Sequence, residues 1–370
     1  MSCARSATTA ALCVGLAALL PTIACATEYR HFGWEEVASG VWFGMPLPNS
    51  FQGGNVAIVT LPGGGSLVVD TQNSEYLGHE ILEKAKEVGH GPVKYVVNTH
   101  LHQDHLGGNV AFRRDNPAVK IIAHTNTCTT APQKTVPRMA DRLPGIVKGL
   151  DDMRAKRASL QDGDQEAAAA LDRRITGTEL YLADAKDFKW EMPNVCLDLK
   201  PGQAKAIAEG GRRIEIRYFG RGHTTGDLVV FLPKEKVAIV GDLWGEKSGY
   251  TFLDAGLDGR EGSVLETPVT LKRVRGLDFD KALSGHTPVM QGKASVDAAI
   301  AAGEQVIAKV KEAADRGQSI GVVLQKMPPP DNAPFFVSDG WRSIVVRTFE
   351  EIELRRQFGM PLPGLAASGK

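Results

Sequence analysis

The 370-residue sequence predicts a mixed α/β fold. Short apolar runs bounded by turn residues indicate strands in two regions, from residue 34 to 122 and again from 213 to 240. Longer segments with apolar residues at helical spacing lie between and after these regions. The second region repeats the strand pattern of the first without recognisable sequence identity, and the chain length alone leaves the number of domains at one or two.

The first 26 residues are typical of an export signal. Arg5 supplies a charged start, residues 10–20 are apolar, and Ala24-Cys25-Ala26 has the small residues that a signal peptidase recognises. The alternative is a membrane anchor with a lipid on Cys25, but the leucine expected three residues before a lipidated cysteine is absent and the apolar run is short. We therefore expect a periplasmic or secreted protein with no stable membrane insertion after cleavage.

The overall charge of the chain is balanced. Lys plus Arg and Asp plus Glu each total 43, and the sequence pI is near 7.1. Such a chain has no basic surface field for a nucleic-acid backbone, so we expect a small-molecule substrate and no nucleic-acid partner. The sequence does not indicate the oligomeric state.

Five cysteines are present, and three of them (Cys3, Cys13 and Cys25) belong to the predicted signal. The mature chain would keep Cys128 and Cys196. In an oxidising compartment these two could form one disulfide, and two separately buried thiols are the alternative.

The first region begins with a predicted hairpin. Val41 to Phe43 and Val56 to Leu61 are apolar runs, the turn 62–65 follows, and Ser66 to Asp70 returns as a strand. A helix is predicted from Glu75 to Val88, because Leu77, Ile81, Leu82 and Ala85 recur at helical spacing. Residues 93–98 form the next predicted strand, which ends at a histidine cluster.

Residues from about 132 to 190 differ in character from the strand regions. Two apolar stripes at helical spacing, one from Ile146 to Leu160 and one from Leu171 to Leu182, flank the loop-like residues 161–164. A helical hairpin inserted into the fold is the natural interpretation. A lid, a dimer contact and a solvated surface element remain equally open as its role.

The second strand region comprises residues 213–218, 228–232 and 237–240. A helix is predicted for residues 294–313, and Ser338-Asp339 opens a last helix with Trp341, Val345, Thr348 and Ile352 on one side. We expect residues 27–315 to form the main domain, residues 316–370 a C-terminal helical extension and tail, and the tail from residue 361 to be disordered.

Metal-ligating residue types concentrate directly after the predicted strands. Five of the nine histidines and two aspartates have this position: His100, His102, Asp104, His105, His223, Asp242 and His286. Imidazole and carboxylate groups gathered at one edge of a sheet suit zinc or a similar divalent ion. Within residues 100–105, the first two histidines can point one way while the following acid and histidine turn toward a second point, so the run can supply two metals.

Five motifs in order resemble the metallo-β-lactamase superfamily. They are Val68-Val69-Asp70-Thr71, the run from His100 to His105 followed by Leu106-Gly107-Gly108, Gly222-His223-Thr224-Thr225-Gly226-Asp227, Val240-Gly241-Asp242, and Ser284-Gly285-His286-Thr287. The resemblance covers the mature chain apart from the helical insert and the C-terminal helix. It implies an αββα sandwich with the metals in a groove at one end of the two sheets.

The resemblance also implies a role for each ligand. One metal would be held by His100, His102 and His223, the other by Asp104, His105 and His286, and Asp242 would bridge them. The expected cofactor is two Zn²⁺ per chain, with iron or manganese as alternatives, and Asp104 and Asp242 are the predicted catalytic residues.

Two further acids have supporting roles in this scheme. Asp70 resembles the acid that orients a ligating histidine, and a cap of the turn at the strand end is its alternative role. For Asp227 we predict stabilisation of a turn.

The implied activity is hydrolysis by a hydroxide shared between the metals, acting on an ester, thioester, lactone or amide bond. Asp242 favours this over antibiotic hydrolysis, because authentic β-lactamases of the family have cysteine or serine at this place. A periplasmic β-lactamase and a mononuclear iron dioxygenase of the persulfide dioxygenase type are the alternatives.

The substrate side of the site is less clearly indicated by the sequence. The loop from Met45 to Phe51 could form a flap, while Trp244 and Tyr250 could line the groove or pack in the core. The remaining histidines have no motif context and are expected at the surface or packed inside: His31, His79, His90 and His124.

Overall fold

The computed structural model describes residues 31–47, 51, 53–161, 163–246, 261–328 and 338–363. The predicted export signal, residues 48–50 of the predicted flap, Tyr250 and the tail from residue 364 lie outside these ranges. None of the helices within them is long and apolar enough to cross a membrane.

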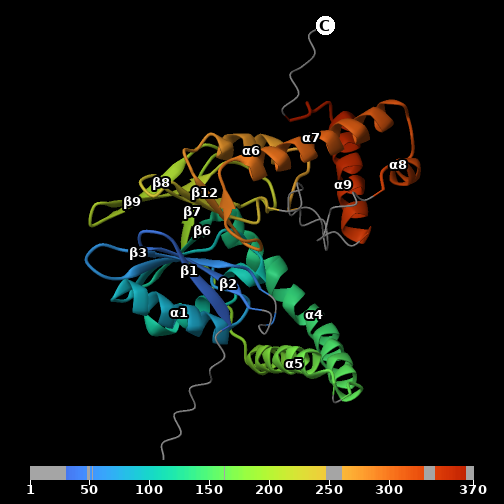
Figure 1. Cartoon of the computed structure of the whole chain (residues 1–370). Helices are drawn as coiled ribbons and strands as arrows, with labels where there is room; N and C mark the ends of the chain where they lie inside the picture. Colours follow the sequence, from blue (N-terminus) through green and yellow to red (C-terminus); the bar gives the residue numbers. More distant parts are fainter. Residues whose placement is uncertain are drawn as a thin grey trace, which may run out of the picture.

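Two β-sheets form the centre of the fold (Figure 1). The first sheet has the order β1-β2-β3-β4-β5-β6-β7, formed by Phe32–Ala38, Val41–Pro46, Val56–Thr60, Ser66–Val69, Val93–Val97, Lys120–His124 and Val195–Leu197. The second has the order β13-β12-β11-β10-β9-β8, formed by Met290–Gln291, Lys281–Ser284, Val237–Gly241, Leu228–Leu232, Arg212–Tyr218 and Ala204–Glu209.

Both sheets contain parallel strands whose carboxyl ends meet at one edge. Strands β4, β5, β6 and β7 run parallel in the first sheet, and β11 and β12 run parallel in the second. Loops that follow such strands lie at the same end of the sheet, where ligand sites commonly form. Asp70, His100, Asp242 and His286 all come from loops of this kind.

The main core lies between the two sheets. Alternate residues of one strand point to opposite faces, so in β3 Ala57 and Val59 face the second sheet while Val56 and Ile58 face the outer helices. Both faces of the central strands are therefore buried, which explains their continuous apolar sequence.

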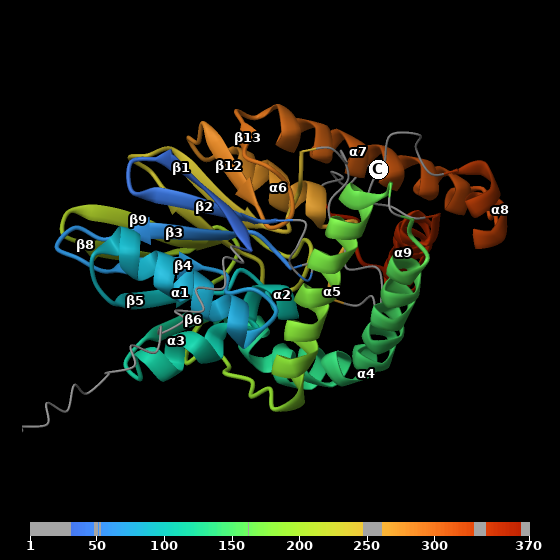
Figure 2. The same ribbon diagram turned by 60° about the horizontal axis from the view of Figure 1, so that its bottom comes forward.

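Helices cover the outer face of each sheet (Figures 1 and 2). Helices α1 (Glu75–Gly89) and α3 (Asn109–Asp115) pack on the first sheet, and α6 (Thr267–Arg275) and α7 (Ala294–Asp315) pack on the second. The arrangement is the αββα sandwich predicted from the sequence.

The inserted hairpin consists of α4 (Thr125–Ala158) and α5 (Gln165–Lys186), which pack against each other and project away from the sheets (Figure 2). Helix α4 starts directly after β6 rather than near residue 132, because His124 caps it by accepting a hydrogen bond from the Asn126 N–H. A disulfide joins Cys128, in the first turns of α4, to Cys196 of β7. The disulfide alternative is therefore confirmed, and the bond closes the hairpin at its base.

The C-terminal helices pack on the far side of α7. Helices α8 (Ile320–Lys326) and α9 (Ser338–Gln357) share an apolar cluster with Val306 and Val310 of α7. The four predicted inward residues of α9 are buried, namely Trp341, Val345, Thr348 and Ile352. The predicted last helix is confirmed, whereas α8 was not predicted.

Glu351 of α9 provides a test of pH-dependent stability. Burial raises the pKa of its carboxyl above the ordinary value, although a 2.7 Å hydrogen bond from Ser263 Oγ and the charge of Arg221 oppose this. A raised folded-state pKa means that the folded protein binds more protons than the unfolded chain as the pH rises past the ordinary pKa of glutamate. The Glu351 carboxyl therefore does not lower the free energy of unfolding at low pH, and it lowers this free energy by its full amount above the folded-state pKa. Glu351→Gln should therefore raise the melting temperature near pH 7.5, and the gain should shrink as the pH falls to about 4.5. Glu353→Gln, on the exposed side of α9, is the control, and a gain independent of pH would contradict the prediction.

Candidate metal centre

The histidine motif folds as a short loop and one helical turn. Strand β5 ends at Val97, and α2 (Gln103–Leu106) begins directly after His102. Leu101 and Leu106 are buried against Ala131 of α4, and the amide of Asn98 donates a 2.7 Å hydrogen bond to the His105 carbonyl. These contacts fix the loop.

Gly108 allows the motif to pack closely on the first sheet. A Cβ at this position would lie 2.0 Å from the Thr71 carbonyl oxygen, a distance that no side chain can adopt. The glycines that follow the histidine run therefore permit the loop after β4, which carries Asp70, to lie against it.

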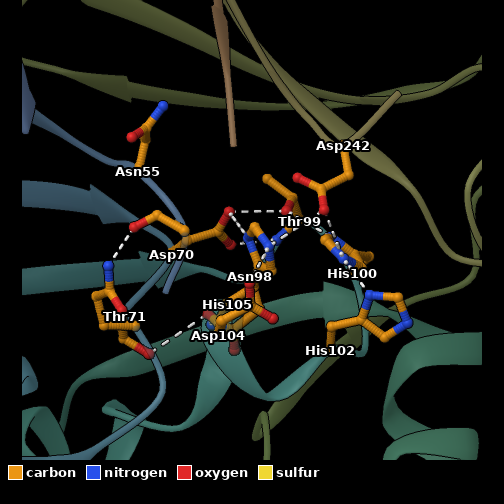
Figure 3. Close-up of polar contacts among 12 residues, drawn as sticks. Asn55, Asp70, Thr71, Asn98, Thr99, His100, His102, Asp104, His105 and Asp242 are labelled. Atoms are coloured by element: carbon orange, nitrogen blue, oxygen red, sulfur yellow. Dashed lines mark hydrogen bonds and ion pairs between the residues drawn. The ribbon is translucent and has the colours of Figure 1, made fainter. Parts of the chain in front are cut away.

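The first group of ligand atoms comes from three loops. His102 Nδ1 lies 3.0 Å from His100 Nε2 and 3.1 Å from His223 Nε2. Asp242 Oδ2 lies 3.7 Å from His100 Nε2 and 3.6 Å from His223 Nε2. Figure 3 shows Asp242 extending from the second sheet toward His100.

The second group lies on the other side of Asp242. Asp104 Oδ2 is 3.2 Å from His286 Nε2 and 3.5 Å from His105 Nε2. Asp242 Oδ2 lies 3.1 Å from His286 Nε2 and 3.5 Å from His105 Nε2. One carboxylate oxygen thus faces four imidazole nitrogens, two from each group.

The chemistry of these atoms fits divalent metal ions. Within each group the ligand atoms lie within 4.8 Å of one another. Among the residues that the structure describes, His105 Nε2 and Asp242 Oδ1 are buried without a hydrogen-bond partner. Buried polar atoms are normally paired, so a convergent set with orphaned members indicates a cation between them. The structure brings together all seven ligands predicted from the sequence.

The protonation states without metal follow from burial and mutual charge. Burial lowers the pKa of His100 well below its ordinary value, and the His105 ring lowers it further. Burial acts to raise the pKa of Asp242, but His286 and His105 hold it well below its ordinary range. For His286, burial lowers the pKa, yet Asp242 and Asp104 together raise it to about 10. The His100 ring and the Asp242 carboxyl therefore already have the forms in which they bind metal, whereas His286 must lose a proton.

Asp70 orients two of the rings from behind (Figure 3). Its Oδ2 accepts from His105 Nδ1 at 2.8 Å and from Thr99 Oγ1 at 2.8 Å. Since the Thr99 hydroxyl hydrogen goes to Asp70, Thr99 Oγ1 accepts from His100 Nδ1, 3.1 Å away. In the neutral form of each ring the proton then lies on Nδ1 and Nε2 is available to a metal, which is the task predicted for Asp70. Without metal, burial lowers the pKa of His105, but Asp242, Asp104 and Asp70 raise it well above the ordinary value, so this ring must also lose a proton.

Asp70→Asn separates this role from the alternative role as a turn cap. Asparagine caps turns equally well and tolerates the left-handed backbone of this residue, whose φ is 63°. We expect zinc affinity to fall by about 10- to 100-fold, because a neutral amide no longer favours the required tautomers. Competition with a chromophoric chelator measures the affinity, and wild-type affinity in Asp70→Asn would leave only the capping role.

Asp227 stabilises the loop that carries His223. Its carboxylate accepts hydrogen bonds from the Thr224 N–H at 2.9 Å and from Thr224 Oγ1 at 2.6 Å. Burial raises the pKa of Asp227 to about 7. These hydrogen bonds agree with the predicted role of Asp227 in stabilising the turn.

Trp244 does not line the groove. Its side chain is fully buried in the core cluster between the second sheet and α7, and its Nε1 donates to Ser295 Oγ at 3.1 Å. The core alternative is therefore correct, because the chain turns inward directly after Asp242. Among the histidines without motif context, His31 and His124 are packed inside, while His79 and His90 are exposed.

Tyr181 of α5 joins the insert to the site, which the sequence did not reveal. Its ring stacks on Phe51 of the predicted flap, with ring centroids 4.1 Å apart. Its hydroxyl accepts a 2.7 Å hydrogen bond from Gln103, between ligands His102 and Asp104. The insert therefore supports the metal-binding loop directly.

A cavity of about 400 Å³ opens beside the ligands His102 and Asp104. Residues of α4 between Gln133 and Arg142 and the side chain of Glu261 also line it. Lys134 of α4 forms an ion pair with Glu261, which also accepts a 2.9 Å hydrogen bond from Thr225 Oγ1 in the His223 loop. The sequence analysis did not predict this wall.

The sandwich, the edge position of the site and the two donor groups together define a candidate metal centre. Residues 50–190 match the family model described as the metallo-beta-lactamase superfamily. Over these residues the chain resembles this superfamily, in agreement with the resemblance of the sequence motifs. Together, the family match and the fold support a metal-dependent hydrolase.

Solved structures with a similar fold include three metallo-β-lactamases. FIM-1 from Pseudomonas aeruginosa, in a mono-zinc form, is 17% identical with a TM-score of 0.51, and the match covers 74% of this chain and 95% of that one. The Pontibacter korlensis protein is 18% identical with a TM-score of 0.50, covering 74% and 99%. The Hirschia baltica protein is 15% identical with a TM-score of 0.50, covering 74% and 97%. At these identities the likeness concerns the fold alone, and the comparison with curated proteins gave no match.

Proposed function

We propose that the protein is an exported hydrolase that uses two zinc ions to cleave an ester, thioester, lactone or amide bond of a small molecule. The observation that carries this proposal is the position of Asp242 Oδ2, which lies 3.1 to 3.7 Å from ring nitrogens of both donor groups. A single-metal site needs only one such group. A shared acid between two groups favours a binuclear centre.

When bound, two divalent ions lower the pKa of a shared water and polarise the scissile oxygen of the substrate. The chain's own contribution is to hold the ligands in place. Asp70 and Thr99 fix the rings of His105 and His100, and Gln103 ties the motif to Tyr181. The cavity beside His102 and Asp104 is the place where a substrate would reach the centre.

Export is supported by two independent features. The first 26 residues have the composition of a cleaved signal. The disulfide between Cys128 and Cys196 is of a kind that persists in oxidising compartments such as the periplasm. We propose a periplasmic or secreted location on these grounds.

The experiment that tests the function combines metal analysis with a substrate panel. Purified protein is reconstituted with zinc, its metal content is measured, and hydrolysis is followed on esters, thioesters, lactones, amides, phosphoesters, sulfate esters and β-lactams. We expect about two zinc ions per chain and turnover of at least one of the first four classes.

Other outcomes would each support a different function. About one iron and no zinc per chain would contradict the hydrolase and favour an iron dioxygenase. Preferential turnover of β-lactams would favour a β-lactamase, the activity named for the structural neighbours, although Asp242 argues against it. No turnover of any class by the zinc-loaded protein would contradict an enzymatic role.

A further inference from the structure

Glu261 lies between the inserted hairpin and the loop that carries the ligand His223. Its side chain is only 9% exposed, and its two carboxylate oxygens contact different elements. Oε1 forms an ion pair with Lys134 of α4, and Oε2 accepts a 2.9 Å hydrogen bond from Thr225 Oγ1. One buried carboxylate thus joins two segments that are distant in the sequence.

The backbone that follows Glu261 also contacts the His223 loop. The Ser263 N–H donates a 3.0 Å hydrogen bond to the Gly222 carbonyl. A Cβ on Gly262 would lie 2.6 Å from the His223 carbonyl oxygen, so glycine is needed for the two segments to pack this closely. The backbone after Glu261 therefore lies directly against that of the ligand.

The position of this loop decides where the His223 ring lies. Its Nε2 is 3.1 Å from His102 Nδ1 and 3.6 Å from Asp242 Oδ2. Ligand atoms of a metal site must be held to within about 0.5 Å, so a small movement of the loop would remove His223 from the first donor group. A hydrogen bond to a carboxylate is stronger than one between neutral groups, which suits the bond between Thr225 and Glu261 to this task.

We propose that Glu261 is a positioning residue for the first donor group, because it fixes His223 through Thr225 and ties this ligand to α4. The inference rests on the proposed metal centre, and it holds whichever bond the enzyme cleaves. Lys134 compensates the charge that Glu261 carries into the interior. The insert then supports the centre from both of its helices, through Lys134 on α4 and through Tyr181 on α5.

The test compares two variants that break the contact from either side. Glu261→Ala removes the carboxylate, whereas Thr225→Val removes only a hydroxyl and keeps the side-chain shape and every charge near the centre. Metal affinity is measured by competition with a chromophoric chelator in the Asp104→Ala background, in which all four members of the first group are present. We expect the Kd of zinc to rise about tenfold with Glu261→Ala and about fivefold with Thr225→Val.

The visible absorption of Co²⁺-loaded protein is the second measurement. Its bands depend on the ligands around the ion, so displacement of His223 should change the spectrum in both variants. The double variant Glu261→Ala, Thr225→Val should lose no more affinity than Glu261→Ala alone, because both substitutions break the same contact.

Glu235→Ala is the matched control for the loss of a buried ion pair. The Glu235 side chain is 10% exposed and pairs with Arg212 at 2.9 Å. It precedes β11, whereas Asp242 follows this strand, so the pair lies at the end of the sheet opposite to the metal centre. Loss of such a pair lowers the free energy of unfolding, but zinc affinity and the Co²⁺ spectrum should stay unchanged.

The outcomes separate this inference from the proposed function. Wild-type affinity and spectrum in Thr225→Val, losses that multiply in the double variant, or an equal loss of affinity in Glu235→Ala would overturn the role of Glu261 and leave the hydrolase standing. Zinc binding that depends on Glu261, without turnover of any substrate class, would overturn the hydrolase and leave the positioning role standing. Wild-type protein that binds neither zinc nor cobalt would overturn both.

Discussion

Asp242→Ala should remove activity almost entirely, because the carboxylate of this residue faces both donor groups. Its Oδ2 lies 3.1 Å from His286 Nε2 and 3.6 Å from His223 Nε2, so its loss weakens both metal positions at once. Mutation of a residue that only orients a metal ligand lowers metal affinity or activity by about 10- to 100-fold. Because Asp242 is itself a predicted ligand, we expect kcat/KM to fall by more than about 100-fold. Zinc content after dialysis, turnover and the far-ultraviolet circular dichroism spectrum measure the effect.

Asp104→Ala is the matched comparison for Asp242→Ala. Asp104 contacts His105 and His286 of the second group, and the four members of the first group remain intact without it. We expect this variant to keep the fold and about one zinc per chain while losing turnover. Equal zinc retention in both variants, or near wild-type kcat in either at matched metal content, would contradict the assignment of Asp242 as the bridging residue.

Loss of the Cys128–Cys196 disulfide should destabilise the protein by roughly 4 kcal/mol. The bond spans a sequence separation of 68 residues, and the chain-entropy relation for a loop of this size gives that magnitude. The double variant Cys128→Ser, Cys196→Ser is compared with the oxidised wild type by urea unfolding at equal metal content. The free energy of unfolding follows from the midpoint and the slope of the transition.

Reduced wild-type protein is the control for the double variant. The two should unfold at the same midpoint, because both lack only the covalent link. A double variant within about 1 kcal/mol of the oxidised wild type would show that the hairpin base is held by packing instead.

Prediction from the sequence succeeded where the pattern is local. Strand β3 was predicted as Val56 to Leu61 and α1 as Glu75 to Val88, within one residue of each observed boundary. Strand β1 was missed because exposed Glu35 and Glu36 interrupt its apolar pattern at the sheet edge. The order of strands within the sheets depends on contacts between distant residues, and periodicity carries no information about these.

The metal ligands could be predicted because each residue type has a specific chemistry and follows a strand end. The cavity wall could not be predicted in the same way. Tyr181 and Arg142 reach the site through the packing of α5 and α4, far from the motifs in sequence. Trp244 illustrates the opposite error, since proximity to Asp242 in the sequence suggested the groove while its side chain is buried in the core.

The disulfide at the base of the hairpin separates two parts of the protein along the sequence. All seven metal ligands and Asp70 lie outside residues 128–196, whereas α4 from Gln133 to Arg142 lies within them. The bond fixes both ends of the insert beside the sheet, whatever sequence the insert carries. The candidate metal ligands and the part of the cavity wall formed by α4 therefore lie in separate segments of the chain, and a hairpin could be exchanged at these two cysteines while the ligand residues stay unchanged.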